Sequence, residues 1–197
     1  MSWTSTERYR IRPAPGGLAL VQELLNTRAI APYGEDVLAD GDSGDRWLRD
    51  VTAAWAEEQG WPGPTGEPRA GDLEGVRALR ERLAALMTGE AEPVRAPTDV
   101  SLRPGLDEEG RVALVPVGDP GEWLEAAVWA QVLLAQADGT WQRLKLCREP
   151  ACRSAFYDRS RNNSGVWHDV RRCGNAANLR ASRARRKQQA AEAPAGE

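Results

Sequence analysis

Residues 147–175 read Cys147-Arg148-Glu149-Pro150-Ala151-Cys152, then Trp167-His168, and finally Cys173-Gly174-Asn175. This stretch holds all three cysteines and the only histidine of the 197-residue chain, in the spacing Cys-x4-Cys-x15-His-x4-Cys. Zinc prefers four tetrahedral nitrogen and sulfur ligands, and two short pairs separated by a longer excursion let one segment wrap around a single ion. The pattern predicts a zinc site formed by Cys147, Cys152, His168 and Cys173.

The ligand set favours a structural site over a catalytic one. Three thiolates and one imidazole fill all four coordination positions, whereas a catalytic zinc keeps one position open for water. A segment of about 45 residues with few large apolar side chains cannot fold alone by burial, whereas zinc contributes roughly 10 to 16 kcal/mol in finger peptides. We therefore predict one structural Zn²⁺ per chain. Two alternatives stay open: the cysteines are small buried apolar residues, or one is a nucleophile with His168 as its base.

Basic residues are concentrated in the same part of the chain. Residues 141–187 contain 13 Lys and Arg against three acidic residues, a net charge of +10. The remaining residues contain 13 basic and 26 acidic side chains, a net charge of −13, so the overall charge is only −3. All basic residues except Lys145 and Lys187 are arginine, which is well suited to bidentate contacts with phosphate and guanine. This asymmetry predicts nucleic acid or another polyanion as a partner.

The segment from Asn175 to Gln189 lacks Gly and Pro and is rich in Ala and Arg, which predicts a helix that starts at the last zinc ligand. Four basic residues at helical spacing, Arg172, Arg180, Arg183 and Lys187, are expected to share one face, flanked by Arg185 and Arg186. Such a helix can enter a major groove or follow phosphates. A solvated basic helix, or one docked on the acidic body or an acidic protein, is the alternative. The candidate nucleic-acid contacts of the finger and helix are Arg153, Arg159, Arg161, Arg171, Arg172, Asn175, Asn178, Arg180, Arg183, Arg185, Arg186 and Lys187.

The first 140 residues are predicted to form helices and one strand pair. Segments 100–103 and 111–115 flank a loop rich in turn residues and predict an antiparallel hairpin. Asp72 and Asp119 are the expected N-caps of the last two helices. Apolar residues recur at helical spacing from Leu18 to Leu25, from Trp47 to Trp55, from Leu73 to Met87 and from Trp123 to Leu134.

The expected fold class is therefore α+β, with three parts. A mainly helical domain with a small antiparallel strand pair covers residues 1–140. A small, treble-clef-like zinc finger that ends in the basic helix covers residues 141–189, and a disordered tail covers residues 190–197.

Several classes of function are disfavoured. No apolar run is long enough to span a bilayer, so we expect no membrane partner. The N-terminus lacks the cationic start and apolar stretch of a secretory signal, which predicts a cytoplasmic protein. Residues 1–140 contain neither Cys nor His, which leaves only carboxylates for catalysis there. The acidic pairs Glu57-Glu58 and Glu108-Glu109 fit a solvated surface better, so we expect no enzyme.

The zinc segment resembles the CGNR zinc-finger family. The resemblance rests on residues 144–162, Trp167-His168 and Cys173-Gly174-Asn175, and covers about 44 residues. His168 replaces the third Cys that is usual in the family, and Ala176 replaces the Arg of its Cys-Gly-Asn-Arg signature.

The preceding body is similar to the ABATE domain that is usually fused to this finger. This second resemblance rests on Leu24-Leu25-Asn26-Thr27-Arg28, on the helix around residues 77–81 and on the strand pair. The two resemblances together imply a DNA-binding transcriptional regulator whose N-terminal domain senses a signal or mediates assembly. RNA in place of DNA, a protein-interaction finger, a ligand-binding protein, a homodimer and a small-molecule or protein signal at residues 1–140 are the open alternatives.

Overall fold

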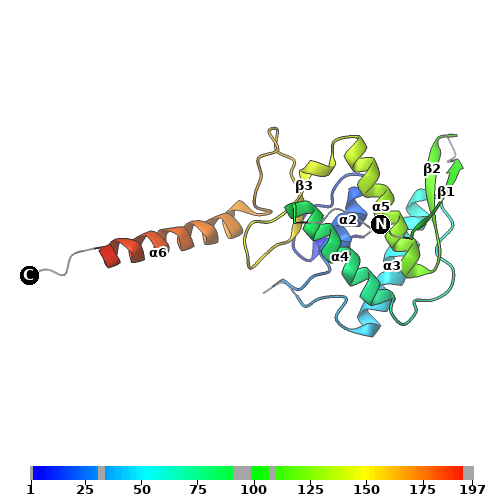
Figure 1. The fold of residues 1–197 in the computed structure, drawn as a ribbon, viewed down its shortest axis with the longest axis horizontal. Coiled ribbons are helices and arrows are strands. Elements are labelled where there is room, and N and C mark those ends of the chain that lie inside the picture. The colour runs from blue at the N-terminus through cyan, green and yellow to red at the C-terminus, as the bar shows by residue number, and fades with distance from the viewer. Residues whose placement is uncertain (1, 31–33, 91–98, 107–109, 193–197) are drawn as a thin grey trace, which may run out of the picture.

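A computed structural model describes residues 2–30, 34–90, 99–106 and 110–192 of the chain, with side chains to residue 189 (Figure 1). Its helices and its two small antiparallel sheets confirm the α+β fold class. The body consists of α1 (Thr4–Glu7), α2 (Leu18–Leu25), α3 (Gly41–Gln59), α4 (Asp72–Thr88), β1 (Ser101–Leu106), β2 (Val112–Val117) and α5 (Pro120–Ala137).

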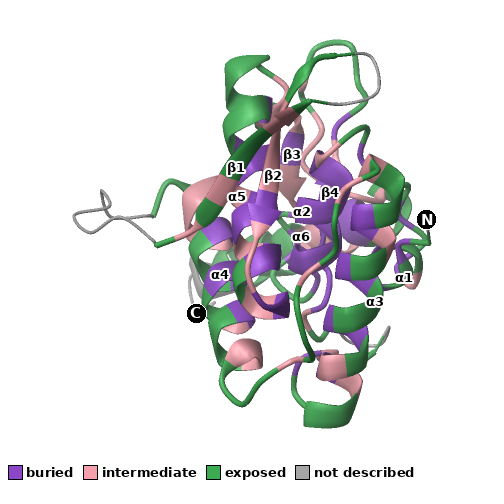
Figure 2. Cartoon of the chain, turned by 90° about the vertical axis from the view of Figure 1, so that its right-hand side faces the viewer, coloured by how far each residue is buried: buried purple, intermediate pink, exposed green. Residues whose placement is uncertain are grey.

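Helix α5 lies at the centre of the body and contacts α2, α3, α4 and the β1–β2 hairpin. Trp123, Leu124 and Val128 of this helix are fully buried. Buried residues gather around α2 and α5, and exposed residues cover the periphery (Figure 2). Because neighbours surround α5 on several sides, it is apolar around most of its circumference.

The starts of the last two body helices test the predicted N-caps. Asp119 caps α5 as expected: its side chain accepts the Glu122 N–H, and the Glu122 carboxylate accepts the Asp119 N–H. The prediction for Asp72 is wrong by one residue, since Gly71 is the N-cap of α4 and Asp72 lies in the first turn. The left-handed backbone of Gly71, with a φ of 99°, suits glycine at this position.

The predicted hairpin is confirmed, with longer strands than the sequence pattern indicated. Strands β1 and β2 pair antiparallel from Ser101 opposite Val117 to Leu106 opposite Val112. The expected loop residues 107–109 lie outside the described residues. The hairpin packs on α5.

The C-terminal part forms a second hairpin followed by a helix. It comprises η1 (Trp141–Arg143), β3 (Leu144–Leu146), β4 (Ala155–Tyr157), the π-helical turn η2 (Val170–Gly174) and α6 (Asn175–Glu192). Strands β3 and β4 pair antiparallel, with Leu146 opposite Ala155. Helix α6 begins at the predicted residue and points away from the rest of the molecule (Figure 1). The expectation of a disordered tail from residue 190 is wrong for residues 190–192, which continue the helix, and residues 193–197 lie outside the described residues.

The body and the second hairpin share a core and a set of buried hydrogen bonds. Leu144 and Ala155 belong to the same apolar cluster as α2, α3, α4 and α5. The side chain of Asn26 acts as an additional peptide group for β4: it accepts the Ala155 N–H at 2.8 Å and donates to the Ala155 carbonyl at 3.1 Å. Gln22 donates to the same carbonyl at 3.1 Å. The finger is therefore joined to α2 by specific hydrogen bonds as well as by apolar packing.

We expect Asn26→Ala to lower the free energy of unfolding by about 3 kcal/mol, because it leaves the buried Ala155 N–H without a partner and opens a small cavity. Asn162→Ala, at an exposed position of the finger, is the control and should change stability by less than about 0.5 kcal/mol. Urea denaturation of the two purified variants measures the difference. Equal effects would show that the Asn26 contact does not join the two parts.

Candidate metal centre

The first two candidate ligands lie on a tight turn at the end of the β3–β4 hairpin. The Cys147 N–H donates to the Ser154 carbonyl at 2.9 Å, which continues the strand pairing past Leu146. The Cys152 N–H donates to the Glu149 carbonyl at 2.8 Å and closes the turn. Arg153 follows in a left-handed conformation with a φ of 56° and turns the chain back into β4. This backbone path buries both cysteines.

The second pair of ligands lies where the chain enters α6. The Asp169 carboxylate accepts the N–H groups of Arg171 and Arg172 at 2.8 and 3.2 Å and so caps η2. The π-helical turn then places Cys173 directly before α6. Because Cys173 belongs to this turn, any ion bound by the four residues also holds the base of α6.

The four side chains form a single group of potential metal ligands within the described residues. Their ligand atoms all lie within 4.8 Å of one another. His168 presents Nδ1 to the cysteines, 3.2 Å from Cys152 Sγ and 3.5 Å from Cys173 Sγ. Zn–S bonds of about 2.3 Å and Zn–N bonds of about 2.0 Å imply S···N edges of about 3.5 Å in a tetrahedron. The spacing of His168 from the two sulfurs therefore fits a tetrahedral zinc site.

The acid–base properties of the cysteines also fit a cation. A hydrogen bond between Cys147 and Cys152 lowers the pKa of Cys152 to about 3 and raises that of Cys147. Burial, together with the charge of Cys152, raises the pKa of Cys173 to about 11. The three closely packed sulfurs thus oppose one another's ionisation. A divalent cation supplies the charge that lets all three bind as thiolates, and the four residues are suited to one structural zinc ion per chain.

Side chains from the body enclose the cluster on one side. Tyr9, Ile11 and Ile30 pack with the three cysteines and Phe156 in a buried apolar group. The Tyr9 hydroxyl donates to the Arg28 carbonyl at 2.7 Å, and burial raises the pKa of Tyr9 to about 12. The phenol beside the site is therefore neutral at physiological pH. Ser154, whose Oγ lies 3.1 Å from Cys152 Sγ, adds a polar contact to that sulfur.

A buried carboxylate organises the long loop between the two ligand pairs. Asp158 accepts from Lys145 Nζ at 2.7 Å, from the Gly165 N–H at 2.6 Å and from the Ser160 N–H at 2.9 Å. Burial alone would raise the pKa of Asp158, but these hydrogen bonds outweigh it and lower the pKa well below its usual range. Lys145 also donates to the carbonyls of Asn163 and Gly165. The loop is thus held to β3 by a satisfied ionic network.

Some of the predicted nucleic-acid contacts bind other parts of the chain, and most of them have exposed side chains. Arg180 forms an ion pair with the buried Glu149 of the tight turn at residues 147–153, which carries Cys147 and Cys152 and is called the cysteine turn below. Arg159 donates to the Pro13 carbonyl at 2.6 Å and lies over the Tyr157 ring. Arg153 is half-buried and lines a cleft on the body side of the finger. The predicted contacts with exposed side chains are Arg161, Arg171, Arg172, Asn175, Asn178, Arg180, Arg183, Arg185, Arg186 and Lys187, and also Arg159.

One basic residue beside the centre was absent from the predicted contacts. Arg10 lies with Tyr9, His168 and Arg171 around a hollow of about 340 Å³ next to the zinc ligands. The alternation of Arg8, Arg10 and Arg12 in an otherwise acidic body was a signal that could have identified it.

The hairpin, the closed set of four ligands and the helix that follows define a structural zinc finger. Residues 143–186 match the family model described as the CGNR zinc finger. The match begins after the helical body and ends within α6, so the ABATE-like assignment of the body stays a prediction. No curated protein matches the chain. Among the described residues, no helix combines the length and apolarity needed to cross a membrane.

We expect the purified protein to contain about one zinc per chain and Cys173→Ser to lose it, because three ligands rarely retain a structural ion. Since Tyr9, Ile11 and Ile30 pack against the ligands, loss of the metal should lower the melting temperature of the whole chain by about 10 °C or more. Metal analysis and calorimetry measure both effects, with Ser164→Ala as a control on the same finger. A variant that lacks zinc but keeps the melting temperature of the wild type would show that the metal site does not stabilise the rest of the chain.

We expect Asp158→Asn to destabilise the protein by about 3 kcal/mol at pH 7, because Lys145 loses its buried counter-charge. The lowered pKa of Asp158 means that this stabilisation is fully present above the ordinary Asp pKa and is lost as the pH falls through the lower folded value. The gap between wild type and variant should therefore be constant from pH 7 to about 5 and shrink below about pH 4. Asp50→Asn, at an exposed site on α3, is the control in denaturant titrations. If the difference in unfolding free energy between wild type and Asp158→Asn increased as the pH fell, the stabilising role of the ionised Asp158 would be contradicted.

Proposed function

We propose that this protein is a zinc-stabilised, DNA-binding transcriptional regulator that contacts nucleic acid through α6 and the adjoining face of the finger. The observation that carries the proposal is the position of α6: a basic helix, anchored at its base by the metal centre, projects away from the body (Figure 1). Apart from the half-buried Ser182, its side chains from Asn178 to Gln189 are exposed. A rigid, exposed, arginine-rich helix is suited to a DNA groove.

The dimensions and charges of α6 support this function. Its 18 residues extend for about 27 Å, and a helix of about 10 to 12 Å diameter fits a major groove about 12 Å wide. Arg183, Arg186 and Lys187 fall within about 100° of the helix circumference, at 100° per residue. Arg185 falls on the other side. A surface of three cations therefore faces one direction and can neutralise phosphates or read guanine edges.

The base of the helix is anchored in two ways. Cys173, in the π-helical turn that precedes the helix, is one of the four zinc-ligand candidates, and Arg180 pairs with Glu149 on the cysteine turn. Both contacts connect α6 to the same small turn of the finger. This arrangement supports a helix whose direction is set before it meets DNA, which lowers the conformational cost of binding.

The hollow beside His168 offers a second group of phosphate contacts. Arg10 from the body and Arg171 from the finger both line it, and both are exposed. A DNA backbone could be held there by cations from both parts of the chain. The acidic remainder of the body, with its net charge of −13 outside residues 141–187, would repel DNA and restrict it to the finger.

The proposal assigns binding, and no catalysis, to the protein. In this proposal the body receives a signal or mediates assembly, including formation of a homodimer. The finger binds DNA in the cytoplasm.

The decisive test is a titration of the full-length protein with duplex DNA at several salt concentrations. Each neutralised phosphate should steepen the slope of log K against log salt by about 0.9. The triple variant Arg183→Gln, Arg186→Gln, Lys187→Gln should therefore reduce the slope by up to about 2.7 and weaken binding at low salt.

The matched control is Arg46→Gln, Arg49→Gln, Arg103→Gln, which removes the same charge from exposed positions of the body. Its slope should equal that of the wild type. Absence of salt-dependent DNA binding, or equal losses in both triple variants, would refute the role of α6. Tighter binding to RNA than to duplex DNA would show that RNA, and not DNA, is the target.

A further inference from the structure

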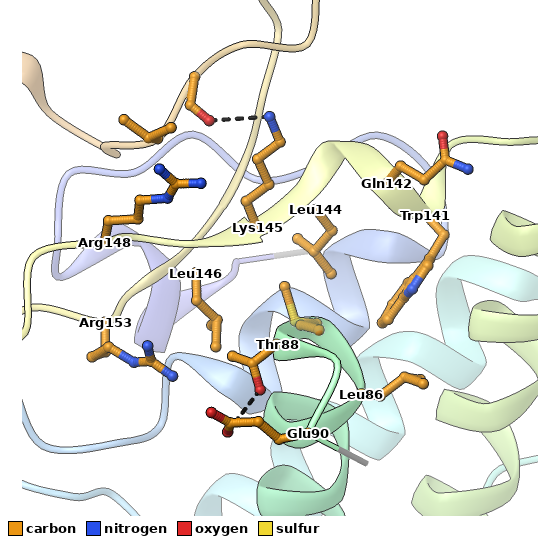
Figure 3. Close-up of a pocket in the computed structure, with 13 residues that line it drawn as sticks. Leu86, Thr88, Glu90, Trp141, Gln142, Leu144, Lys145, Leu146, Arg148 and Arg153 are labelled. Carbon is orange, nitrogen blue, oxygen red and sulfur yellow. Dashed lines mark hydrogen bonds between the residues drawn. The ribbon is translucent and has the colours of Figure 1, made fainter. Parts of the chain in front are cut away.

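A cleft of about 650 Å³ lies between the body and the finger (Figure 3). One wall comes from the end of α4 and the residues after it, including Met87 and Glu90. The opposite wall comes from η1, β3 and the cysteine turn, and the loop at Gly165 and Val166 closes one side. Its volume lies within the range of about 300 to 1,000 Å³ that is usual for small-molecule sites.

Part of the cleft surface is apolar. Leu86, Met87, Trp141, Leu144 and Leu146 line it, and all five belong to, or pack against, the main core of the protein. The cleft is thus backed by the main apolar core of the protein. An apolar surface on such a rigid support can bind the hydrocarbon or aromatic part of a ligand.

Two arginines beside this apolar wall have no side-chain partner among the described residues. Arg148 and Arg153 flank Leu146 in the cleft (Figure 3). Within the part of the chain that the structure describes, neither guanidinium forms a hydrogen bond or an ion pair. Arg153 is only half-exposed, so its charge is held close to the apolar surface.

The other charged groups of the described lining are Lys145 and Glu90. Lys145 Nζ is bound by Asp158 and by two loop carbonyls. Glu90, the only acidic residue among the described residues of the lining, accepts a hydrogen bond from the neutral Thr88 hydroxyl at 2.9 Å and keeps its negative charge. With Lys145 paired to Asp158, the two guanidiniums outnumber the single Glu90 carboxylate, so the described lining keeps an excess of positive charge. A guanidinium binds carboxylate or phosphate through paired hydrogen bonds.

We infer that this cleft binds a small organic anion with an apolar body and a carboxylate or phosphate head. The head group lies between Arg148 and Arg153, and the apolar part lies on Met87, Leu146 and Trp141. Such a ligand contacts α4 and the cysteine turn at once. It therefore links the body to the metal centre, at a site separate from the exposed face of α6 and independent of whether the protein binds DNA.

The test uses zinc-loaded full-length protein and 8-anilinonaphthalene-1-sulfonate, an aromatic anion whose fluorescence rises in apolar sites. We expect saturable binding at one site per chain. Decanoate and decyl phosphate are added as competitors, and the stronger of the two identifies the preferred head group. N-phenyl-1-naphthylamine, a neutral analogue of the probe, should bind more weakly.

The double variant Arg148→Gln, Arg153→Asn should bind the anionic probe about tenfold or more weakly, with little effect on the neutral analogue. Asn is chosen at residue 153 because it tolerates the left-handed backbone. The control Arg49→Gln, Arg103→Gln removes the same charge from the body surface and should bind as the wild type does.

Zinc content and melting temperature report whether each variant is folded. If the double variant loses zinc, Met87→Glu decides the question, because it places a negative charge on the opposite wall, away from the ligands, and should weaken the anionic probe by a similar factor. An unchanged affinity in a folded double variant or in Met87→Glu, or an equal loss in the control, would overturn the inference.

Discussion

Three buried sulfurs and an imidazole nitrogen lie within 4.8 Å of one another, which constrains this part of the chain to an arrangement suited to one structural zinc ion. Most features of the C-terminal half depend on this constraint. A bound ion holds the cysteine turn against the π-helical turn that leads into α6, and so it fixes the direction in which that helix leaves the finger. The same constraint also creates the apolar cluster in which Tyr9, Ile11 and Ile30 of the body take part. The metal centre is therefore a shared core element of both parts and not an isolated module.

The body contributes to the finger in return. Asn26 and Gln22 extend the hydrogen bonding of β4, and Leu144 and Ala155 complete the core around α2 and α5. This integration matters for charge as well. The chain places a strongly basic segment beside a strongly acidic one, and the contacts that join them at the interface are mainly apolar or hydrogen-bonded. The basic side chains of α6 are thus left at the surface, although an acidic partner is available in the same molecule.

The sequence predicted the features that depend on local spacing. The ligand set, the body helices α2 to α5, the β1–β2 hairpin and the helix after Cys173 all follow from residue types within one short segment of the chain each. The partners of individual arginines could not be predicted this way. Arg180 meets Glu149 and Arg159 meets Pro13 across 31 and 146 residues of sequence, through folding of the whole chain. The π-helical turn also removes Arg172 from the regular helix, so its assumed common face with Arg180 has no basis in α6. Arg10 was missed because its neighbours in space belong to the finger.

Attachment at one end gives α6 the geometry of a lever. Its contacts lie at its first turns, while its far end stands about 27 Å away along an axis of 18 residues. A rotation of about 10° at the π-helical turn would displace the far end by about 5 Å, more than the 3.4 Å rise of one base pair. Small adjustments of the cysteine turn, or of the body surfaces that support it, are thereby amplified at the tip of the helix. The positions of Arg185 and Arg186 therefore depend strongly on the orientation of the finger relative to the body.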